Sequence, residues 1–243
     1  MIRILSLCLI ITSWTGNSQP ADHSPWTEIL QTYVSDKGEV NYKELRNNKS
    51  VLENYLEKLA ANPPNDKWDT DTQKAYWINL YNGLVIQIVL RQYPDATLNT
   101  QINKRKKLVK VAGVKLSLKD IENRILRPIW QDRKVLFALS CGALGCPNIQ
   151  PQAYTSANSK QLLNRSVREF INHPRGLVVD RQSLQASKLF DWYAEDFGSQ
   201  KKMIKFFAHY AEDNKALYLL GFKGTIAYGY DSRINAPEAQ WPS

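Results

Sequence analysis

The sequence predicts an α+β fold in a single domain, with a central buried helix, several peripheral helices and short β-strands or hairpins. A chain of 243 residues has the length of one large domain or two small ones. Its composition, 43% hydrophobic and 23% charged, is that of a globular protein and argues against disorder. Helical and strand-like segments follow one another without regular alternation, which favours the α+β class. We expect the domain to span residues 24–235.

Helices are predicted where apolar residues recur at a helical spacing. The predicted helices are 24–34, 50–60, 71–92, 158–172 and 200–211. The 71–92 helix carries apolar residues around most of its circumference, so it is expected to be central and buried on several sides. Trp77 and Leu84 on this helix should therefore both be buried.

Strand-like segments are short. We predict a hairpin over 107–116, a short helix from the capping residue Ser117 to Leu126, and a buried strand over 135–139. A second hairpin joins 177–179 to 184–186, and a last strand falls within 224–230.

The N-terminus has the pattern of a secretory signal peptide. Arg3 precedes an apolar run of about ten residues, which is half of the ~20 needed to span a bilayer. Small residues at Gly16 and Ser18 then predict cleavage after Ser18, so residues 1–18 are the signal peptide. The mature chain would be periplasmic or secreted and would have no transmembrane segment. The alternative is a buried N-terminal helix.

Two cysteines remain in the mature chain, Cys141 and Cys146. The predicted strand 135–139 leads directly into the glycine-rich loop that carries them, and we expect Cys141 in a concave region walled partly by the 75–90 helix. Three interpretations stay open. Cys141 is a catalytic nucleophile if its surroundings lower its pKa from ~8.5, the pair forms a disulfide, or both are inert buried thiols.

Asn79 and Asn82 stand in the middle of the 71–92 helix, although asparagine is a poor helix former. A buried amide needs hydrogen-bond partners. Asn79 is therefore a candidate to bind a ligand and Asn82 to orient a catalytic group; structural hydrogen bonding is the alternative for both.

Glu122 and Arg127 lie five residues apart around the end of the short 117–126 helix. Glu122 is a second catalytic candidate beside Cys141, and Arg127 a candidate ligand contact. The two side chains could instead pair with each other or lie on a solvated helix face.

Four segments in a fixed order, 75–82, 116–128, 137–147 and 190–197, resemble the domain of unknown function 547 family. The resemblance covers roughly residues 70–200 and implies membership of a family of bacterial exported and plant proteins, but no established activity. Asn123 and Leu136 stand where family members often carry histidine. The histidines at 23, 173 and 209 are not evidently placed to serve Cys141, which weakens a Cys–His mechanism.

The chain is basic, with 32 Lys and Arg against 23 Asp and Glu, a net charge of +9. The main basic cluster comprises Lys104, Arg105, Lys106 and Lys107. It is expected to attract an anionic envelope component, with a solvated loop as the alternative. No nucleic-acid motif accompanies it, so no nucleic acid is expected. With three cysteines and three histidines, no metal or cofactor is expected.

These observations predict an exported, noncatalytic module that binds or interacts in the cell envelope and contains a structural cysteine pair. The alternative is a thiol-dependent hydrolase or transferase with Cys141 as nucleophile. The sequence leaves open whether the protein is an enzyme.

N-terminal sequencing of the protein from the native envelope fraction should begin at Gln19 or within a few residues of it, because the signal peptide is removed on export. An intact Met1 on soluble cytoplasmic protein would contradict the predicted export.

Overall fold

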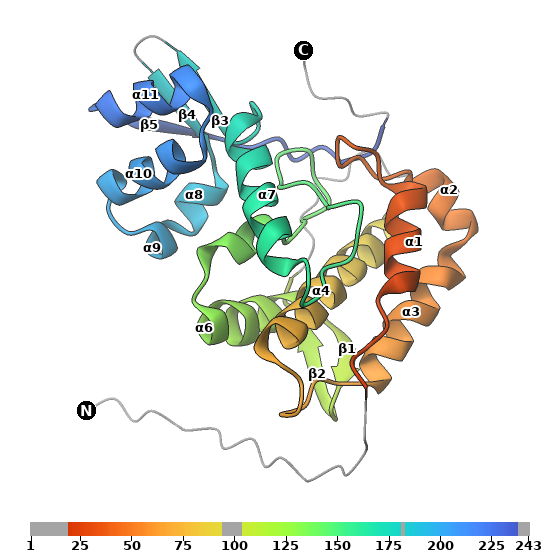
Figure 1. The fold of residues 1–243 in the computed structure, drawn as a ribbon. Coiled ribbons are helices and arrows are strands. Elements are labelled where there is room, and N and C mark those ends of the chain that lie inside the picture. The colour runs from red at the N-terminus through yellow and green to blue at the C-terminus, as the bar shows by residue number, and fades with distance from the viewer. Residues whose placement is uncertain (1–18, 94–103, 181–182, 238–243) are drawn as a thin grey trace.

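The protein is described by a computed structural model that covers residues 19–93, 104–180 and 183–237. The predicted α+β class is confirmed: helices make up most of the fold, and two small sheets lie apart from each other at its edges (Figure 1). Strands β1 (Lys107–Val111) and β2 (Val114–Ser117) form an antiparallel hairpin. Strands β3 (Leu177–Asp180), β4 (Ser183–Ser187) and β5 (Ile226–Gly229) form the second sheet, in which β5 pairs parallel to β4. The predicted signal peptide lies outside the described residues.

The longer helices agree with the predicted ranges. They are α1 (Ser24–Tyr33), α3 (Lys49–Ala61), α4 (Thr70–Gln92), α7 (Ser159–Asn172) and α10 (Gln200–Tyr210). Four further helices were not predicted: α2 (Tyr42–Asn47), α8 (Leu189–Trp192), α9 (Ala194–Phe197) and α11 (Asp213–Gly221). None of these helices in the described part of the chain is both long and apolar enough to cross a membrane.

Helix α4 is the central buried element, as predicted. The side chain of Asp69 caps its first turn by accepting hydrogen bonds from two backbone N–H groups. Leu84 is buried, and Gly83 lets α3 approach closely, because a Cβ there would lie 2.8 Å from Leu56 Cδ2. The prediction for Trp77 was wrong: this side chain is only partly buried, since it packs on the outside of the core, edge-on to Tyr76.

The chain after the hairpin begins with the predicted cap. Ser117 and Asp120 form a reciprocal capping box at the start of α5 (Leu118–Asp120). The helix then widens into a π-helical segment, η1 (Ile121–Leu126), and continues as α6 (Arg127–Trp130). Such π-helical turns are rare and are often found at functional sites.

The predicted strand at 135–139 is wrong. The segment forms a 3₁₀-helix, η2 (Arg133–Phe137), whose N-terminus is capped by Asp132. Its apolar residues are buried as expected, but they face two different hydrophobic clusters. Val135 packs into one cluster and Phe137 into the other. A short apolar run buried on all sides has the same sequence pattern in a strand as in a helical turn.

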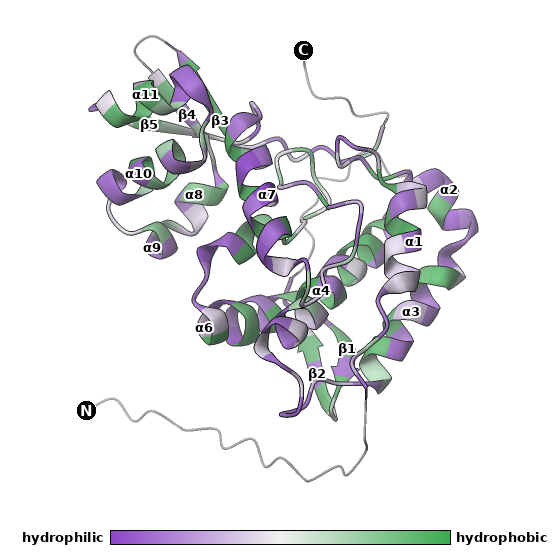
Figure 2. Ribbon diagram, viewed as in Figure 1, coloured by the Kyte–Doolittle hydropathy of each residue, from purple (hydrophilic) through white to green (hydrophobic). Residues whose placement is uncertain are grey.

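The first cluster is formed mainly by α1, α2, α3, α4 and the segments that pack on them. The second lies between α7, α8, α10 and the three-stranded sheet, and its centre is aromatic. The Phe137 ring lies 5.6 Å from that of Phe170 and 5.9 Å from that of Phe190. The ribbon of α7 shows hydrophobic and hydrophilic residues in turn, as expected for a helix with one face in this cluster (Figure 2).

Replacing Leu84 with alanine should lower the free energy of unfolding by ~2–5 kcal/mol, because the side chain is 2% exposed and its loss leaves a cavity beside α4. A denaturant titration measures this loss. Leu217→Ala is the matched control, since Leu217 is 70% exposed and should change stability little. A loss below about 0.5 kcal/mol for Leu84→Ala would contradict the central place of α4.

Candidate functional site

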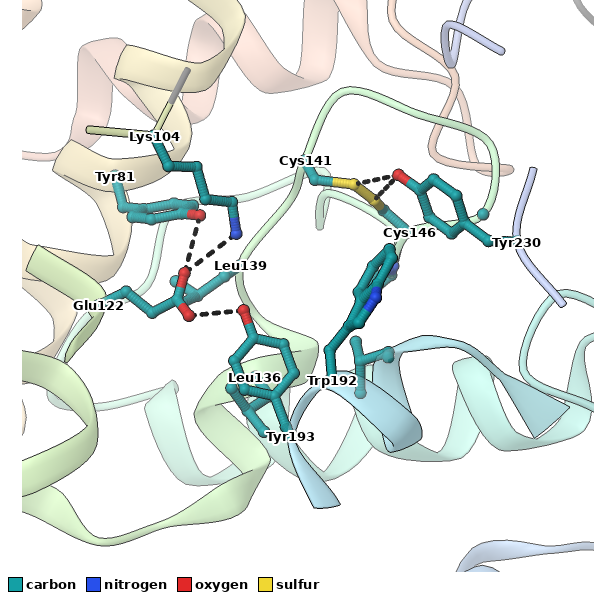
Figure 3. A pocket seen from close by; sticks show the side chains of 13 residues that line it. Tyr81, Lys104, Glu122, Leu136, Leu139, Cys141, Cys146, Trp192, Tyr193 and Tyr230 are labelled. Atoms are coloured by element: carbon teal, nitrogen blue, oxygen red, sulfur yellow. Dashed lines mark hydrogen bonds and ion pairs between the residues drawn. A yellow bond between two sulfur atoms is a disulfide. The ribbon is translucent and has the colours of Figure 1, made fainter. Parts of the chain in front are cut away.

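A narrow pocket of about 40 Å³ lies where α4, η1, the loop after η2, α8 and the C-terminal segment meet (Figure 3). One wall carries a polar cluster centred on Glu122, and the opposite wall carries Trp192, Tyr230 and the two cysteines. Leucine side chains at 136, 139 and 189 supply apolar surface. Space of this size admits about one small group, such as a water molecule or a hydroxymethyl group.

Glu122 is the buried charge of this pocket, with 4% of its surface exposed. Its Oε1 accepts a hydrogen bond from the Tyr193 hydroxyl at 2.5 Å. Its Oε2 accepts from the Tyr81 hydroxyl at 3.3 Å and forms an ion pair with Lys104 Nζ at 3.1 Å. Burial of a carboxylate is costly unless it is paired and hydrogen-bonded, and these three donors meet that requirement.

Burial and the charge of Glu122 shift the pKa values of the groups around this carboxylate. Burial raises the pKa of Tyr193 and of Tyr81 above the ordinary value, so both remain neutral hydroxyl donors. Burial is the largest single influence and alone would lower the pKa of Lys104, but the interactions with Glu122 and Tyr193 together outweigh it and the pKa is raised. Lys104 is therefore a cation, and the pair it forms with Glu122 carries no net charge.

Arg127 does not pair with Glu122 and does not line the pocket. Its guanidinium donates to Asp196 Oδ2 at 2.5 Å and to Asn123 Oδ1 at 2.9 Å. The guanidinium carbon lies 5.1 Å from the centre of the Tyr193 ring. Arg127 thus packs on the ring of Tyr193, whose hydroxyl contacts Glu122. Neither Glu122 nor Arg127 lies on a solvated helix face, so that alternative interpretation was wrong.

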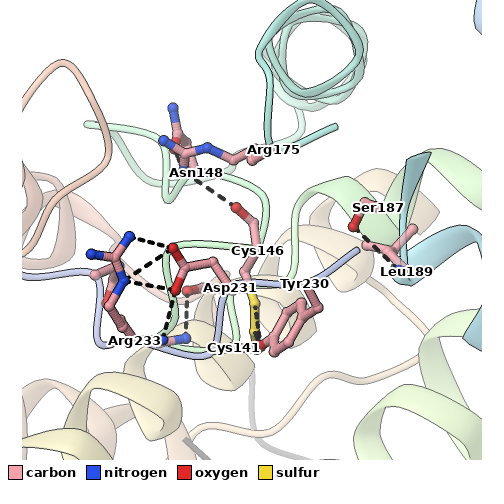
Figure 4. Close-up of a disulfide and its surroundings, with 12 residues drawn as sticks. Cys141, Cys146, Asn148, Arg175, Ser187, Leu189, Tyr230, Asp231 and Arg233 are labelled. Carbon is pink, nitrogen blue, oxygen red and sulfur yellow. Dashed lines mark hydrogen bonds and ion pairs between the residues drawn. A yellow bond between two sulfur atoms is a disulfide. The ribbon is translucent and has the colours of Figure 1, made fainter. Parts of the chain in front are cut away.

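Cys141 and Cys146 form a disulfide beside the pocket, with Cα atoms 5.9 Å apart (Figure 4). This arrangement corresponds to the disulfide, one of the three interpretations left open by the sequence. Tyr230 Oη lies 3.1 Å from Cys141 Sγ and 3.5 Å from Cys146 Sγ. Gly142 has a φ of +74°, which allows the sharp turn inside the loop.

The disulfide loop holds the C-terminal segment in place. Leu144 N–H donates to the carbonyl of Arg233, and Gly145 N–H to that of Asp231, each at 2.8 Å. A Cβ at Gly145 would lie 2.7 Å from Asp231 N, so only glycine allows this approach. Asn235 N–H donates back to the carbonyl of Gly142 at 3.1 Å. These contacts place Tyr230 at the pocket.

The two asparagines of α4 bind backbone and do not line the pocket. Asn82 donates to the Ala138 carbonyl at 2.8 Å and accepts from Ser140 N–H at 2.9 Å. Asn79 makes the same two-ended contact with Tyr154, at 2.8 and 3.0 Å. Both amides are engaged at each end, which is the structural hydrogen bonding left open from the sequence.

Comparison with known proteins identifies one region of the chain. Residues 65–171 match the family model described as "Protein of unknown function, DUF547". This region, less than half of the chain, is similar to the DUF547 domain. No curated protein and no solved structure matches the sequence.

The DUF547 match contains three of the four segments on which the resemblance rested, together with Glu122 and both cysteines. The fourth segment, 190–197, lies beyond it. Trp192, Tyr193 and Tyr230 therefore reach the pocket from outside the matched part of the DUF547 domain.

The sequence analysis missed the aromatic residues of the pocket. Tyr81 belongs to the buried face of α4, and Trp192 and Tyr193 stand among acidic residues at the end of α8. The sequence feature that could have pointed to Tyr81 and Tyr193 as pocket residues is their place in the segments that resemble the DUF547 family. No histidine lines the pocket in the described part of the chain. Likewise, no group of three or more potential metal ligands occurs among the described residues.

The basic cluster is partly used inside the protein. Lys104 pairs with Glu122, and Lys107 Nζ lies 2.6 Å from Asp120 Oδ2. Lys106 and Arg105 are exposed beside them. Lys104 and Lys107 therefore help to hold the hairpin and the π-helical segment in place.

Thiol counting on native protein purified without reductant and cleaved after Ser18, which removes Cys8, should find no free thiol, because Cys141 and Cys146 are bonded. Reduction should then lower the free energy of unfolding by ~1–3 kcal/mol, since a short loop loses less than the ~3 kcal/mol of a fifteen-residue one. A native protein in which Cys141 reacts with iodoacetamide at neutral pH much faster than Cys146 would contradict the closed pair.

Proposed function

We propose that the protein is exported and acts as a noncatalytic binding module of the cell envelope, with Cys141–Cys146 as a structural pair. The disulfide is the observation that carries this proposal. The nucleophilic form of cysteine is the thiolate. A cysteine in a disulfide cannot form a thiolate and so cannot attack a substrate.

The remaining acid of the pocket is also occupied. Glu122 accepts hydrogen bonds from two tyrosine hydroxyls and pairs with an ammonium group. A general base needs a lone pair directed at a substrate proton, within about 2.6–3.2 Å of it. Three bound donors leave Glu122 better suited to hold its neighbours in position than to exchange protons.

The pocket has the features of a surface that binds a ligand. Trp192 stands at its rim with 53% of its surface exposed, whereas large aromatic side chains are usually well buried. Exposed aromatic groups beside a small polar recess are common in binding sites, where a few polar groups fix the orientation of the ligand. Tryptophan and tyrosine are also the residues most often dominant in binding energy.

The envelope location rests on the N-terminal pattern and on the basic charge. Lys106 and Arg105 remain exposed next to the pocket residue Lys104, so an anionic envelope component could be attracted to this side of the molecule. The attraction would weaken with salt, as expected for exposed charges.

A second function has one observation in its favour: both cysteines line the pocket. Once reduced, Cys141 would face the pocket with the Tyr230 hydroxyl 3.1 Å away, a donor able to stabilise a thiolate. A thiol-dependent hydrolase or transferase is therefore the alternative, and it requires the reduced protein.

The binding proposal is tested by co-sedimentation with insoluble envelope material from cells that make the protein. The wild-type protein should sediment with this material, and in a titration Trp192→Ala should raise the apparent dissociation constant about 10-fold, the loss of about 1.4 kcal/mol expected for an aromatic contact. Trp130→Ala is the matched control, because Trp130 is a partly buried tryptophan that does not line the pocket. Failure of the wild-type protein to sediment would overturn the proposal.

A further inference from the structure

We infer that the pocket binds the terminal unit of a neutral glycan, with one hydroxyl or hydroxymethyl group inside and the sugar ring resting on Trp192. This inference depends on the binding function proposed above and names the ligand class of the pocket itself, as distinct from the anionic component expected at the exposed Arg105 and Lys106. It rests on three features of the site, namely its size, its balanced charge and its aromatic rim.

The size of the pocket decides how much of a ligand enters. A space of about 40 Å³ holds a hydroxymethyl group but not a six-membered ring. The bulk of the ligand must therefore remain at the mouth, where Trp192 is exposed. A ligand with small polar groups projecting from a rigid ring meets both requirements, because one group can enter the pocket while the ring stays at the mouth.

The charges of the pocket favour a neutral ligand. Lys104 and Glu122 neutralise each other at 3.1 Å, and a charged ligand would compete with one partner for the other. A hydroxyl group both donates and accepts, while an ammonium group has three donors and a carboxylate about four acceptor positions. The Lys104 ammonium has three donors, so one hydroxyl can accept from it without separating the ion pair. Figure 3 shows the Lys104 ammonium and the Glu122 carboxylate side by side on this wall.

The rim supplies the apolar part of the contact. Sugars have a polar edge of hydroxyl groups and a face of C–H bonds, and that face packs against aromatic rings. Trp192 and Tyr230 lie with ring centres 4.9 Å apart at an angle of 64°, so they form a joined aromatic wall. Tyr230 is held there by the disulfide loop, which makes this wall rigid before a ligand arrives.

The probes are neutral tetrasaccharides of glucose, galactose, mannose, xylose and N-acetylglucosamine in α and β linkages, with tetragalacturonate as the charged comparison. Binding is measured by calorimetry and by tryptophan fluorescence on the disulfide-bonded protein. At least one neutral tetrasaccharide should bind, and Trp192→Ala and Lys104→Met should each weaken it at least tenfold. Trp130→Ala should leave the affinity unchanged, and circular dichroism should show that all variants are folded.

Any other result of these binding experiments contradicts a specific part of the inference. If no neutral tetrasaccharide binds while envelope co-sedimentation still requires Trp192, the sugar inference is wrong and the binding function stands. Equal or tighter binding of tetragalacturonate would overturn the neutral ligand. Saccharide binding that survives Trp192→Ala would place the site elsewhere. Absence of both saccharide and envelope binding would overturn the inference together with the proposed function.

Discussion

The two hydrogen bonds of the Asn82 side chain connect the buried face of α4 to the chain just before Cys141, and the pocket depends on them. They fix the backbone of Ala138 and Ser140, from which the disulfide loop starts. That loop in turn binds the segment around Asp231 and so sets the position of Tyr230. A buried backbone group left without its partner costs about 1–3 kcal/mol, so the asparagine is strongly constrained at a position where it lowers helix propensity.

Polar groups inside α4 thus organise chain segments that are distant in sequence. Asn79 lies one turn from Asn82 on the same side of the helix and holds Tyr154 by the same two-ended contact. Tyr81 reaches Glu122 from the same helix. The ion pair of Glu122 with Lys104 needs a different explanation, because replacing a buried ion pair with apolar residues is often neutral or stabilising. Its presence at the pocket is consistent with the binding role proposed above.

Local features of the fold could be predicted from the sequence, and long-range ones could not. The capping box of Ser117 and Asp120 forms within four residues, and the apolar pattern of α4 repeats along one element. The strand prediction for 135–139 was wrong because this segment lies between two hydrophobic clusters. All of its side chains are therefore apolar, and their pattern has neither the period of a strand nor that of a helix. Glu122 meets Tyr193 across 71 positions, and no spacing rule connects them. The cysteine pair was recognised as notable, but closure of the loop depends on the turn at Gly142 and the approach at Gly145.

The division of the pocket between two parts of the chain bears on how its specificity is set. The polar wall at Glu122 and the disulfide lie within the DUF547 match, whereas Trp192 and Tyr193 come from the segment after it. Tyr193 links the two, since it donates to Glu122 while Arg127 supports its ring. Changes at Trp192 would alter the rim without disturbing the paired charges, because its ring contacts Tyr230 and not Glu122. Under the proposed binding function, ligand choice can therefore vary at the rim, while the paired charges at the base of the pocket stay fixed because their burial demands full pairing.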